Sequence, residues 1–308
     1  MATIALVLSG CGVYDGAEIH ESVLTLLALS EAQATVKIYA PDTPQAHVIN
    51  HLKGAVVEEE TRNVLVESAR IARGNISALS TIDLSEIDAV VLPGGFGVAK
   101  NLCTFAFDGP DCNLNQEVSD LLQAAHAAGK PLGFACIAPA LAARVFNEGL
   151  LTLGHADDPS VSGLQALGAT HQACTADSIV VDEQRRVVST PAYMIDAPLT
   201  AIRTGLKQMV DQVLAWCLPE DQRVQLSDLQ GWTLHGGALY QRFTFDNFLQ
   251  ALSFTQKVGQ LAEELQHHPD LSLGWGYVEI KLITHDIGGL GKLDFSLATR
   301  INQLKVNS

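Results

Sequence analysis

Short apolar runs that end in glycine-rich turns are the feature that most constrains the fold of this chain. Residues 4–8 form one run, closed by the Ser-Gly-Cys-Gly turn of residues 9–12, and residues 89–92 form another, closed by the Pro-Gly-Gly turn of residues 93–95. Runs of this kind are typical of strands buried on both faces of a parallel sheet. Helical patterns such as residues 18–30 lie between them and would supply the crossover connections. We therefore predict a doubly wound α/β domain, flavodoxin-like in type.

The pattern changes after residue 217. Residues 218–229 contain Pro219 and few apolar side chains, so we interpret them as a linker. Beyond them, hairpin-like strands and an alternating strand over residues 275–284 accompany two helical patterns, over residues 248–266 and 294–304. This order predicts a small α+β domain with an antiparallel sheet packed on helices. The predicted organisation is thus a domain over residues 1–217, a linker over 218–229 and a second domain over 230–308. Within the first domain, a helix is also predicted around residues 45–52.

Charge and cysteine usage exclude several classes of protein. The net charge is −15 and no cluster of Lys and Arg stands out, so the chain is poorly suited to nucleic acid or to anionic membranes. No apolar run reaches the ~18 residues that cross a bilayer. The cysteines are spread singly without a CxxC pair, which is typical of a reduced, cytoplasmic protein. They are Cys11, Cys103, Cys112, Cys136, Cys174 and Cys217.

Three histidines near the end of the chain are candidates for proton transfer. His267 and His268 close a helical pattern, and His285 follows a strand-like run. Imidazole titrates near neutral pH, so such a group suits either acid/base chemistry or a metal ion. Adjacent histidines point apart, and the usual carboxylate or cysteine partner at close spacing is missing. Acid/base chemistry is therefore favoured, and no metal is expected.

The spacing around these histidines carries a family resemblance. The pattern Glu263-x3-His267-His268-Pro269-x5-Trp275-x9-His285-x8-Asp294 resembles the signature of the pterin-4a-carbinolamine dehydratases. The resemblance covers about residues 224–304. It implies dehydration of 4a-hydroxytetrahydrobiopterin, or a related pterin, to the quinonoid dihydropterin, without a metal or redox cofactor. It also implies a homo-oligomer.

The resemblance also implies roles for individual residues. His267 and His285 are the expected acid/base pair, and His268 is expected to bind the pterin. Trp275 either belongs to the core or borders the pterin pocket. Asp294 stands at the start of a helix, where capping is the expected role.

The first domain has its own candidate, Cys136. The stretch Gly-Phe-Ala-Cys-Ile-Ala-Pro of residues 133–139 puts this thiol between a strand and a helix. A thiol there faces a helix N-terminus, which favours the thiolate, and the arrangement is that of a nucleophile elbow. An ordinary buried cysteine is the alternative interpretation, because free cysteine is among the most buried residue types.

The first domain resembles the ThiJ/PfpI superfamily, which is class I glutamine amidotransferase-like, and in particular its ElbB-like, glyoxalase-like branch. The matching stretches are residues 9–21, 61–64, 93–97, 136–139 and 190–194. The resemblance implies that Cys136 is a nucleophile, that Glu18 hydrogen-bonds its sulfur, and that the Gly94 and Gly95 amides bind an oxyanion. A 2-oxoaldehyde would be the substrate.

One departure from the superfamily concerns the general base. Many catalytic members carry His directly after the cysteine, whereas this chain has Ile137. Glu18, His20 and His155 are candidate substitutes. The alternatives are that the first domain is a non-catalytic thiol sensor or binding module, or that both domains are degenerate.

Overall fold

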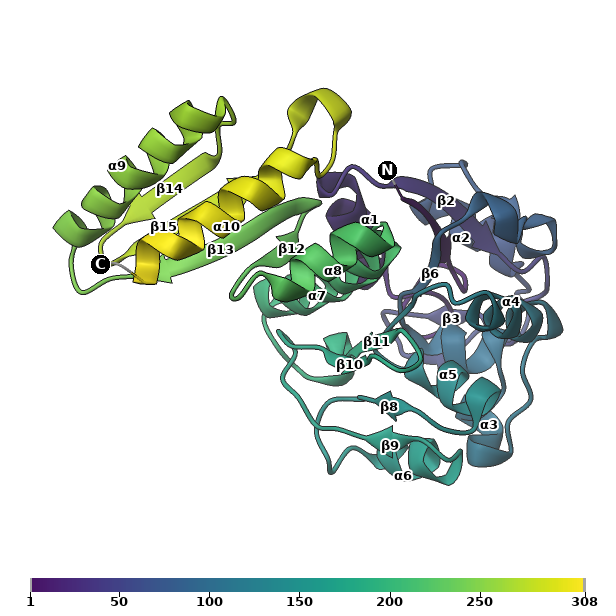
Figure 1. The fold of residues 1–308 in the computed structure, drawn as a ribbon. Coiled ribbons are helices and arrows are strands. Elements are labelled where there is room, and N and C mark those ends of the chain that lie inside the picture. The colour runs from purple at the N-terminus through teal and green to yellow at the C-terminus, as the bar shows by residue number, and fades with distance from the viewer. Residues whose placement is uncertain (1, 307–308) are drawn as a thin grey trace. The chain divides into compact units, whose positions relative to one another are not determined.

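The computed structural model describes residues 2–306 of the chain, and it divides close to residue 217 into two compact units (Figure 1). The first unit holds most of the residues before Leu218, and the second is built from Leu218 onward. Each unit has its own sheet and its own buried apolar residues. The change of pattern after residue 217 therefore coincides with a real change of architecture.

The first unit is organised around a seven-stranded sheet in the described residues, with the order β10-β11-β7-β6-β1-β2-β5. Its strands are β1 (Thr3–Val7), β2 (Thr35–Ala40), β5 (Ser77–Ala78), β6 (Ala89–Leu92), β7 (Leu132–Ala135), β10 (Val180–Asp182) and β11 (Val187–Thr190). All neighbouring pairs are parallel except β10 with β11, which form an antiparallel hairpin at one edge. The predicted doubly wound α/β fold is confirmed.

The same unit contains seven helices in the described residues. They are α1 (Ile19–Glu31), α2 (Val64–Ile71), α3 (Phe105–Asp108), α4 (Gln116–Ala127), α5 (Pro139–Phe146), α6 (Pro159–Ala166) and α7 (Leu199–Cys217). Shorter elements are β3 (Ile49–Asn50), β4 (Ala55–Val56), β8 (Leu150–Leu151), β9 (Thr170–His171), the 3-10 turns η1 (Leu79–Thr81), η2 (Leu84–Glu86), η4 (Gly109–Asp111) and η5 (Ala192–Met194), and the π-turn η3 (Val98–Leu102).

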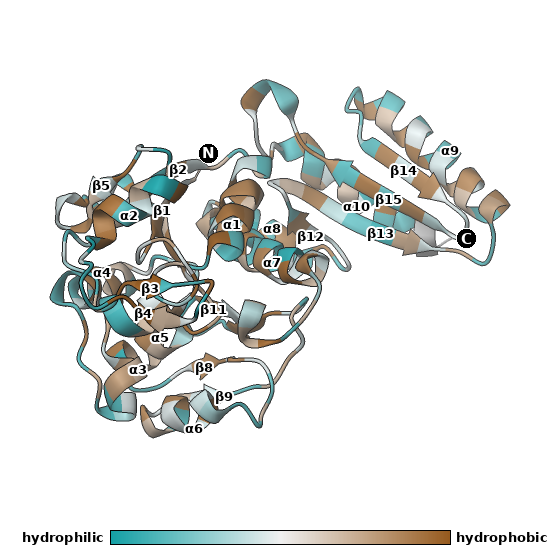
Figure 2. Cartoon of the chain, turned by 180° about the vertical axis from the view of Figure 1, so that it is seen from behind, coloured by the Kyte–Doolittle hydropathy of each residue, from teal (hydrophilic) through white to brown (hydrophobic). Residues whose placement is uncertain are grey.

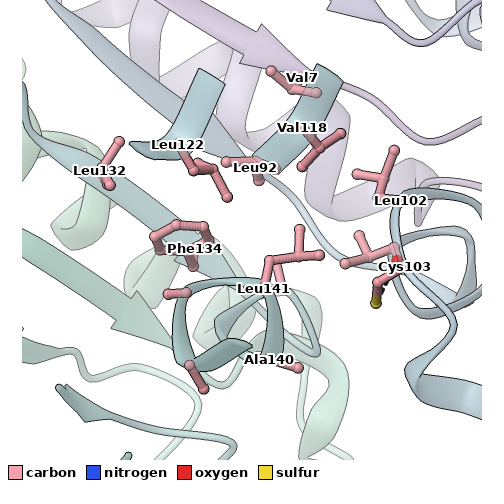
Figure 3. Close-up of a cluster of buried hydrophobic side chains, with 14 of the residues drawn as sticks. Val7, Leu92, Leu102, Cys103, Val118, Leu122, Leu132, Phe134, Ala140 and Leu141 are labelled. Carbon is pink, nitrogen blue, oxygen red and sulfur yellow. Dashed lines mark hydrogen bonds between the residues drawn. The ribbon is translucent and has the colours of Figure 1, made fainter. Parts of the chain in front are cut away.

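The core on the α4 and α5 side is built from alternate residues of the strands. Leu92 and Phe134 on the strands meet Leu122 on α4 and Leu141 on α5, and all four are fully buried (Figure 3). Burying one such side chain stabilises the fold by about 1.5–3 kcal/mol. On the opposite face, α7 packs directly on β7, because Gly133 presents no side chain there.

The helix predicted around residues 45–52 is wrong. Ile49 and Asn50 form β3, which pairs with β4 in a small hairpin. The buried carboxylate of Asp15 accepts a hydrogen bond of 2.7 Å from the Ile49 N–H. A long-range polar contact therefore replaces the local helical bonding that the residue pattern suggested.

The second unit contains a four-stranded antiparallel sheet in the order β12-β13-β15-β14. Its elements are α8 (Glu220–Asp228), β12 (Thr233–His235), β13 (Ala238–Thr244), α9 (Phe248–Leu265), β14 (Asp270–Gly274), β15 (Tyr277–Leu282), the 3-10 turn η6 (His285–Ile287) and α10 (Lys292–Val306). Apolar and polar residues are mixed along α9 and α10, as expected for helices with one face on a sheet (Figure 2). The predicted small α+β domain is confirmed.

Two details of this unit differ from the sequence-based expectation. Residues 218–229, interpreted as a linker, contain α8, which belongs to the second unit. Pro219 precedes the helix, and Glu220 and Asp221 in its first turn complement the helix dipole. The strand expected over residues 275–284 begins only at Tyr277, because Trp275 and Gly276 turn the chain between β14 and β15.

Candidate functional site

His267 is held in a fixed position directly after α9. Helix α9 ends at Leu265. The next residue, Gln266, has a left-handed backbone, with φ of 50°, which turns the chain. The His267 N–H still donates to the Ala262 carbonyl at 3.0 Å, so the residue is tied to the last turn of the helix. Its side chain is almost fully buried, with 10% of it exposed. The ring is thus fixed by the end of the helix and by its buried surroundings.

The partner of His267 is the fully buried carboxylate of Asp294 in the first turn of α10. The His267 Nε2 and Asp294 Oδ1 atoms are 2.7 Å apart. The other oxygen, Oδ2, accepts hydrogen bonds from the Thr284 hydroxyl at 2.8 Å and from the Gly291 N–H at 2.7 Å. The bond to Gly291 caps the helix start, as the sequence predicts for Asp294. The same carboxylate orients His267, a role that the sequence did not reveal.

The other predicted residues of this site lie at its surface. His285 is exposed, and it follows Thr284, whose hydroxyl bonds the same carboxylate as His267. His268 is exposed and pairs with Glu263, with 3.0 Å between Nε2 and Oε2. Trp275 is 75% exposed, so the interpretation of Trp275 as a core residue is wrong. The unit therefore offers one buried, oriented imidazole and two accessible ones.

Cys136 lies at the turn between β7 and α5, as predicted. Its φ of 57° falls in the left-handed region, which is uncommon for residues other than glycine. Backbone N–H groups of Gly95 and Ile137 donate to its sulfur. A Cβ atom on Gly94 would stand 2.2 Å from the Cys136 Cβ, so only glycine fits there. A strained backbone held by close packing is typical of a functional site.

The carboxyl group beside the Cys136 sulfur is that of Glu21, which hydrogen-bonds the thiol. Glu21 is fully buried and accepts hydrogen bonds from the N–H groups of Gly94 at 2.9 Å and Tyr193 at 3.1 Å. Burial raises the pKa of Glu21 to about 7. Burial, followed by the charge of Glu21, also raises the pKa of the Cys136 thiol. Both raised pKa values favour the protonated forms of the two groups, contrary to the thiolate that the position of Cys136 before a helix predicts.

Glu18 has a different place from the one the resemblance implies. Its side chain accepts the Glu21 N–H at 2.7 Å and so caps the start of α1. The Gly94 amide is occupied by Glu21, whereas the Gly95 amide does face the Cys136 sulfur. Glu18 and Glu21 are three residues apart at the start of α1. The rotation of this helix about its axis decides which of the two carboxyl groups reaches the cysteine.

The candidate substitute bases are placed differently from one another. His20 Nδ1 lies 3.0 Å from the hydroxyl of Tyr193, whose backbone N–H bonds Glu21. His20 therefore belongs to the surroundings of the cysteine. His155 is exposed in the connection between β8 and α6.

Two features are absent from the described residues. Among residues 2–306, no helix combines the length and the apolar character that crossing a bilayer requires. In the same residues, no three His, Cys, Asp or Glu side chains are grouped so that they would hold a metal ion.

Comparison with known proteins identifies two families in one chain. The model for pterin 4 alpha carbinolamine dehydratase matches residues 217–304. A protein of Thermosynechococcus vestitus named as a pterin-4-alpha-carbinolamine dehydratase is 43% identical over 88 residues, which is 29% of this chain and 93% of that protein. Both match the second unit.

The remainder of the chain matches a different group. The human glutamine amidotransferase-like class 1 domain-containing protein 3 is 49% identical over 221 residues, covering 69% of this chain and 82% of that protein. A crystal structure of an Ehrlichia chaffeensis isoprenoid biosynthesis protein with an amidotransferase-like domain is 33% identical with a TM-score of 0.66, covering 71% of this chain and all of that one.

The relatives correct one prediction. The human protein and its rat and zebrafish counterparts are named as mitochondrial proteins, which contradicts the expected cytoplasmic location. Scattered free cysteines indicate a reducing compartment, and they do not distinguish one such compartment from another.

The chain therefore belongs to the pterin-4a-carbinolamine dehydratase family through residues 217–304 and, through its first two thirds, to the ES1 and glutamine amidotransferase-like class 1 domain-containing proteins.

Proposed function

We propose that the second unit dehydrates a 4a-hydroxytetrahydropterin, with His267 and His285 as the acid/base pair. The observation that carries this proposal is the 2.7 Å contact between His267 and the buried Asp294 carboxylate. A carboxylate only accepts hydrogen bonds, so the proton of that contact belongs to Nε2. Nδ1 is then left to exchange a proton with a ligand. Asp294 would also stabilise the charged imidazolium as it forms.

The reaction requires two proton movements, which two imidazoles in opposite protonation states can perform. One ring delivers a proton to the departing C4a hydroxyl, and the other removes one from a ring nitrogen. General acid/base help of this kind is typically worth about 10²–10⁴-fold in rate. His268 and Trp275 are accessible on the same unit and would bind the pterin. The proposed step uses side chains alone.

The test is a dehydratase assay on the full chain. His285→Ala is expected to lower kcat at least about tenfold, and His267→Ala at least as much, because general acid/base help is lost. His268→Ala is expected to raise KM more than it lowers kcat. His126→Ala, in α4 of the first unit, is the matched histidine control. Full activity of His285→Ala, or complete dependence on an ion that a chelator removes, would overturn the proposal.

A second candidate function belongs to Cys136. The buried Glu21 carboxyl beside the thiol favours a nucleophile whose base is Glu21, in place of a histidine after the cysteine. We infer a glyoxalase-like reaction, in which a 2-oxoaldehyde and water give a 2-hydroxy acid without an external oxidant. The rival function is a thiol sensor.

Methylglyoxal and mild peroxide distinguish these two functions. Conversion of methylglyoxal to lactate, abolished by Cys136→Ser and by Glu21→Gln, supports the enzyme. Selective oxidation of Cys136 without any turnover supports the sensor and refutes the enzyme. We also expect a homo-oligomer, which sedimentation of the full chain tests.

A further inference from the structure

A second pair of cysteines lies where η3 and the segment after η4 run side by side. Cys103 forms an antiparallel bridge with Leu114. The bridge is fixed on both sides, because the Thr104 N–H donates to the Asn113 carbonyl and the Asn115 N–H donates to the Leu102 carbonyl, both at 2.9 Å. The chain between them, residues 104–113, is therefore a closed loop with a fixed base.

Cys112 stands two residues before Leu114 and lies with Cys103 in the same buried apolar cluster. Both residues have extended backbones, with φ of −154° and −60°. Both are buried in the same apolar cluster, and the Cys103 side chain is close enough to the Cys112 sulfur to interact with it. Two neighbouring thiols on segments that are bonded together can become a disulfide, whose sulfur–sulfur bond is about 2.05 Å.

We propose that Cys103 and Cys112 are an oxidisable dithiol, which hydrogen peroxide converts into a disulfide that closes the loop of residues 104–111. The proposal is independent of the roles inferred for Cys136 and for the histidines. Cys136 has no cysteine partner among its described contacts, so peroxide would take it to oxyacids. The dithiol instead forms a disulfide, which a thiol reductant converts back to two thiols.

Cys112 is the thiol suited to react first. Its pKa is lowered to about 7, mainly by its interaction with the Cys103 side chain and also by the Arg144 guanidinium. The same interaction, together with burial, raises the pKa of Cys103, which therefore keeps its proton. Arg144 is held close by a 2.8 Å bond from Nε to the Cys112 carbonyl.

The two-step oxidation balances. The Cys112 thiolate attacks one peroxide oxygen, the O–O bond breaks, and the departing hydroxide takes a proton to become water. The Cys103 sulfur then attacks the resulting sulfenic acid, forming the S–S bond and releasing a second water with the Cys103 proton. Two thiols thus lose two electrons and two hydrogens, and one peroxide becomes two waters.

The loop structure shows how an oxidant could reach Cys112 and what a disulfide would change nearby. Asp111 and Asn113, on either side of Cys112, are exposed, so a small oxidant needs only to pass one layer of residues. The Cys103 sulfur also lies 3.4 Å from the Val98 carbonyl at the start of the π-turn η3. Disulfide formation removes that donor from Val98. The bond therefore changes the element that follows the Gly94–Gly95 turn of the Cys136 site.

The experiment uses the full chain, treated with stoichiometric peroxide near pH 7.5, alkylated and cleaved after Lys100 and Glu117. Residues 101–117 contain Cys103 and Cys112 and no other cysteine. The expected peptide has lost two hydrogens and takes no alkyl group until it is reduced. Pre-organisation predicts that the bond forms at least about tenfold faster in the native chain than in guanidinium.

Single variants separate this proposal from general oxidation. In Cys103→Ser, Cys112 should accumulate as a sulfenic acid that dimedone traps, and in Cys112→Ser, Cys103 should stay alkylatable. Cys174→Ser is the matched control and should leave the mass loss unchanged. A peptide that stays doubly alkylatable while Cys136 is oxidised would overturn the proposal, as would equal rates in native and denatured chain.

Discussion

Replacing Glu21 with Gln should change how the stability of the first unit depends on pH. The carboxyl is fully buried, and its pKa rises from an ordinary 4.5 to about 7 because burial disfavours the charge. The folded state therefore keeps a proton that the unfolded state has lost. Stability is highest below pH 4.5 and falls as the pH rises towards 7. At about 1.36 kcal/mol per pKa unit, Glu21 costs the folded unit roughly 3 kcal/mol at pH 8 relative to pH 4.

Glu21→Gln removes the titrating group, so the free energy of unfolding of the variant minus that of the wild type should rise by roughly 3 kcal/mol between pH 4 and pH 8. Alkylation of Cys136, which is buried in the folded unit, measures unfolding across a denaturant series by mass spectrometry. Glu21→Met is the matched control and should give the same pH dependence with a different constant offset. A difference that is flat with pH, or that falls, would refute the reasoning.

Three further outcomes follow from single contacts. Asp294→Ala should destabilise the second unit by about 3–5 kcal/mol in denaturant unfolding, because His267, Thr284 and the Gly291 N–H lose one buried carboxylate; a loss below about 1 kcal/mol would contradict that role. Gly94→Ala should abolish thiol chemistry at Cys136 and destabilise the first unit by about 1–3 kcal/mol, since a Cβ would stand 2.2 Å from the Cys136 Cβ. Trp275→Ala should leave the unfolding midpoint unchanged, because the side chain is 75% exposed, while the KM for the pterin rises; an unchanged KM would remove Trp275 from the pterin site.

The sequence predicted the parallel sheet well because its strands are buried on both faces. In a chain with helical crossovers, uninterrupted apolar runs such as residues 4–8 and 89–92 indicate strands that are buried on both faces. Gly133 and Cys136 likewise follow from local geometry, a strand that runs into a helix through a tight turn. These predictions succeed because residues close together in the sequence determine the structure at these positions.

The errors have a common physical cause, which is that a distant contact decides the outcome. Asp15 bonds the Ile49 N–H, and a strand replaces the helix expected there. Glu18 and Glu21 both begin α1, and the fold turns the second one to the cysteine. The Asp294 contact with His267 spans 27 residues, so spacing alone could assign Asp294 only its capping role.

The shared carboxylate of Asp294 has a consequence for how the second unit is maintained. Because one group begins α10 and orients His267, fraying of the first turn of that helix also releases the imidazole. In the proposed mechanism, brief opening of this turn, far smaller than unfolding of the unit, would therefore be enough to stop the acid/base chemistry. Under the same proposal, substitutions at Gly291 or Thr284 would affect catalysis through the position of His267.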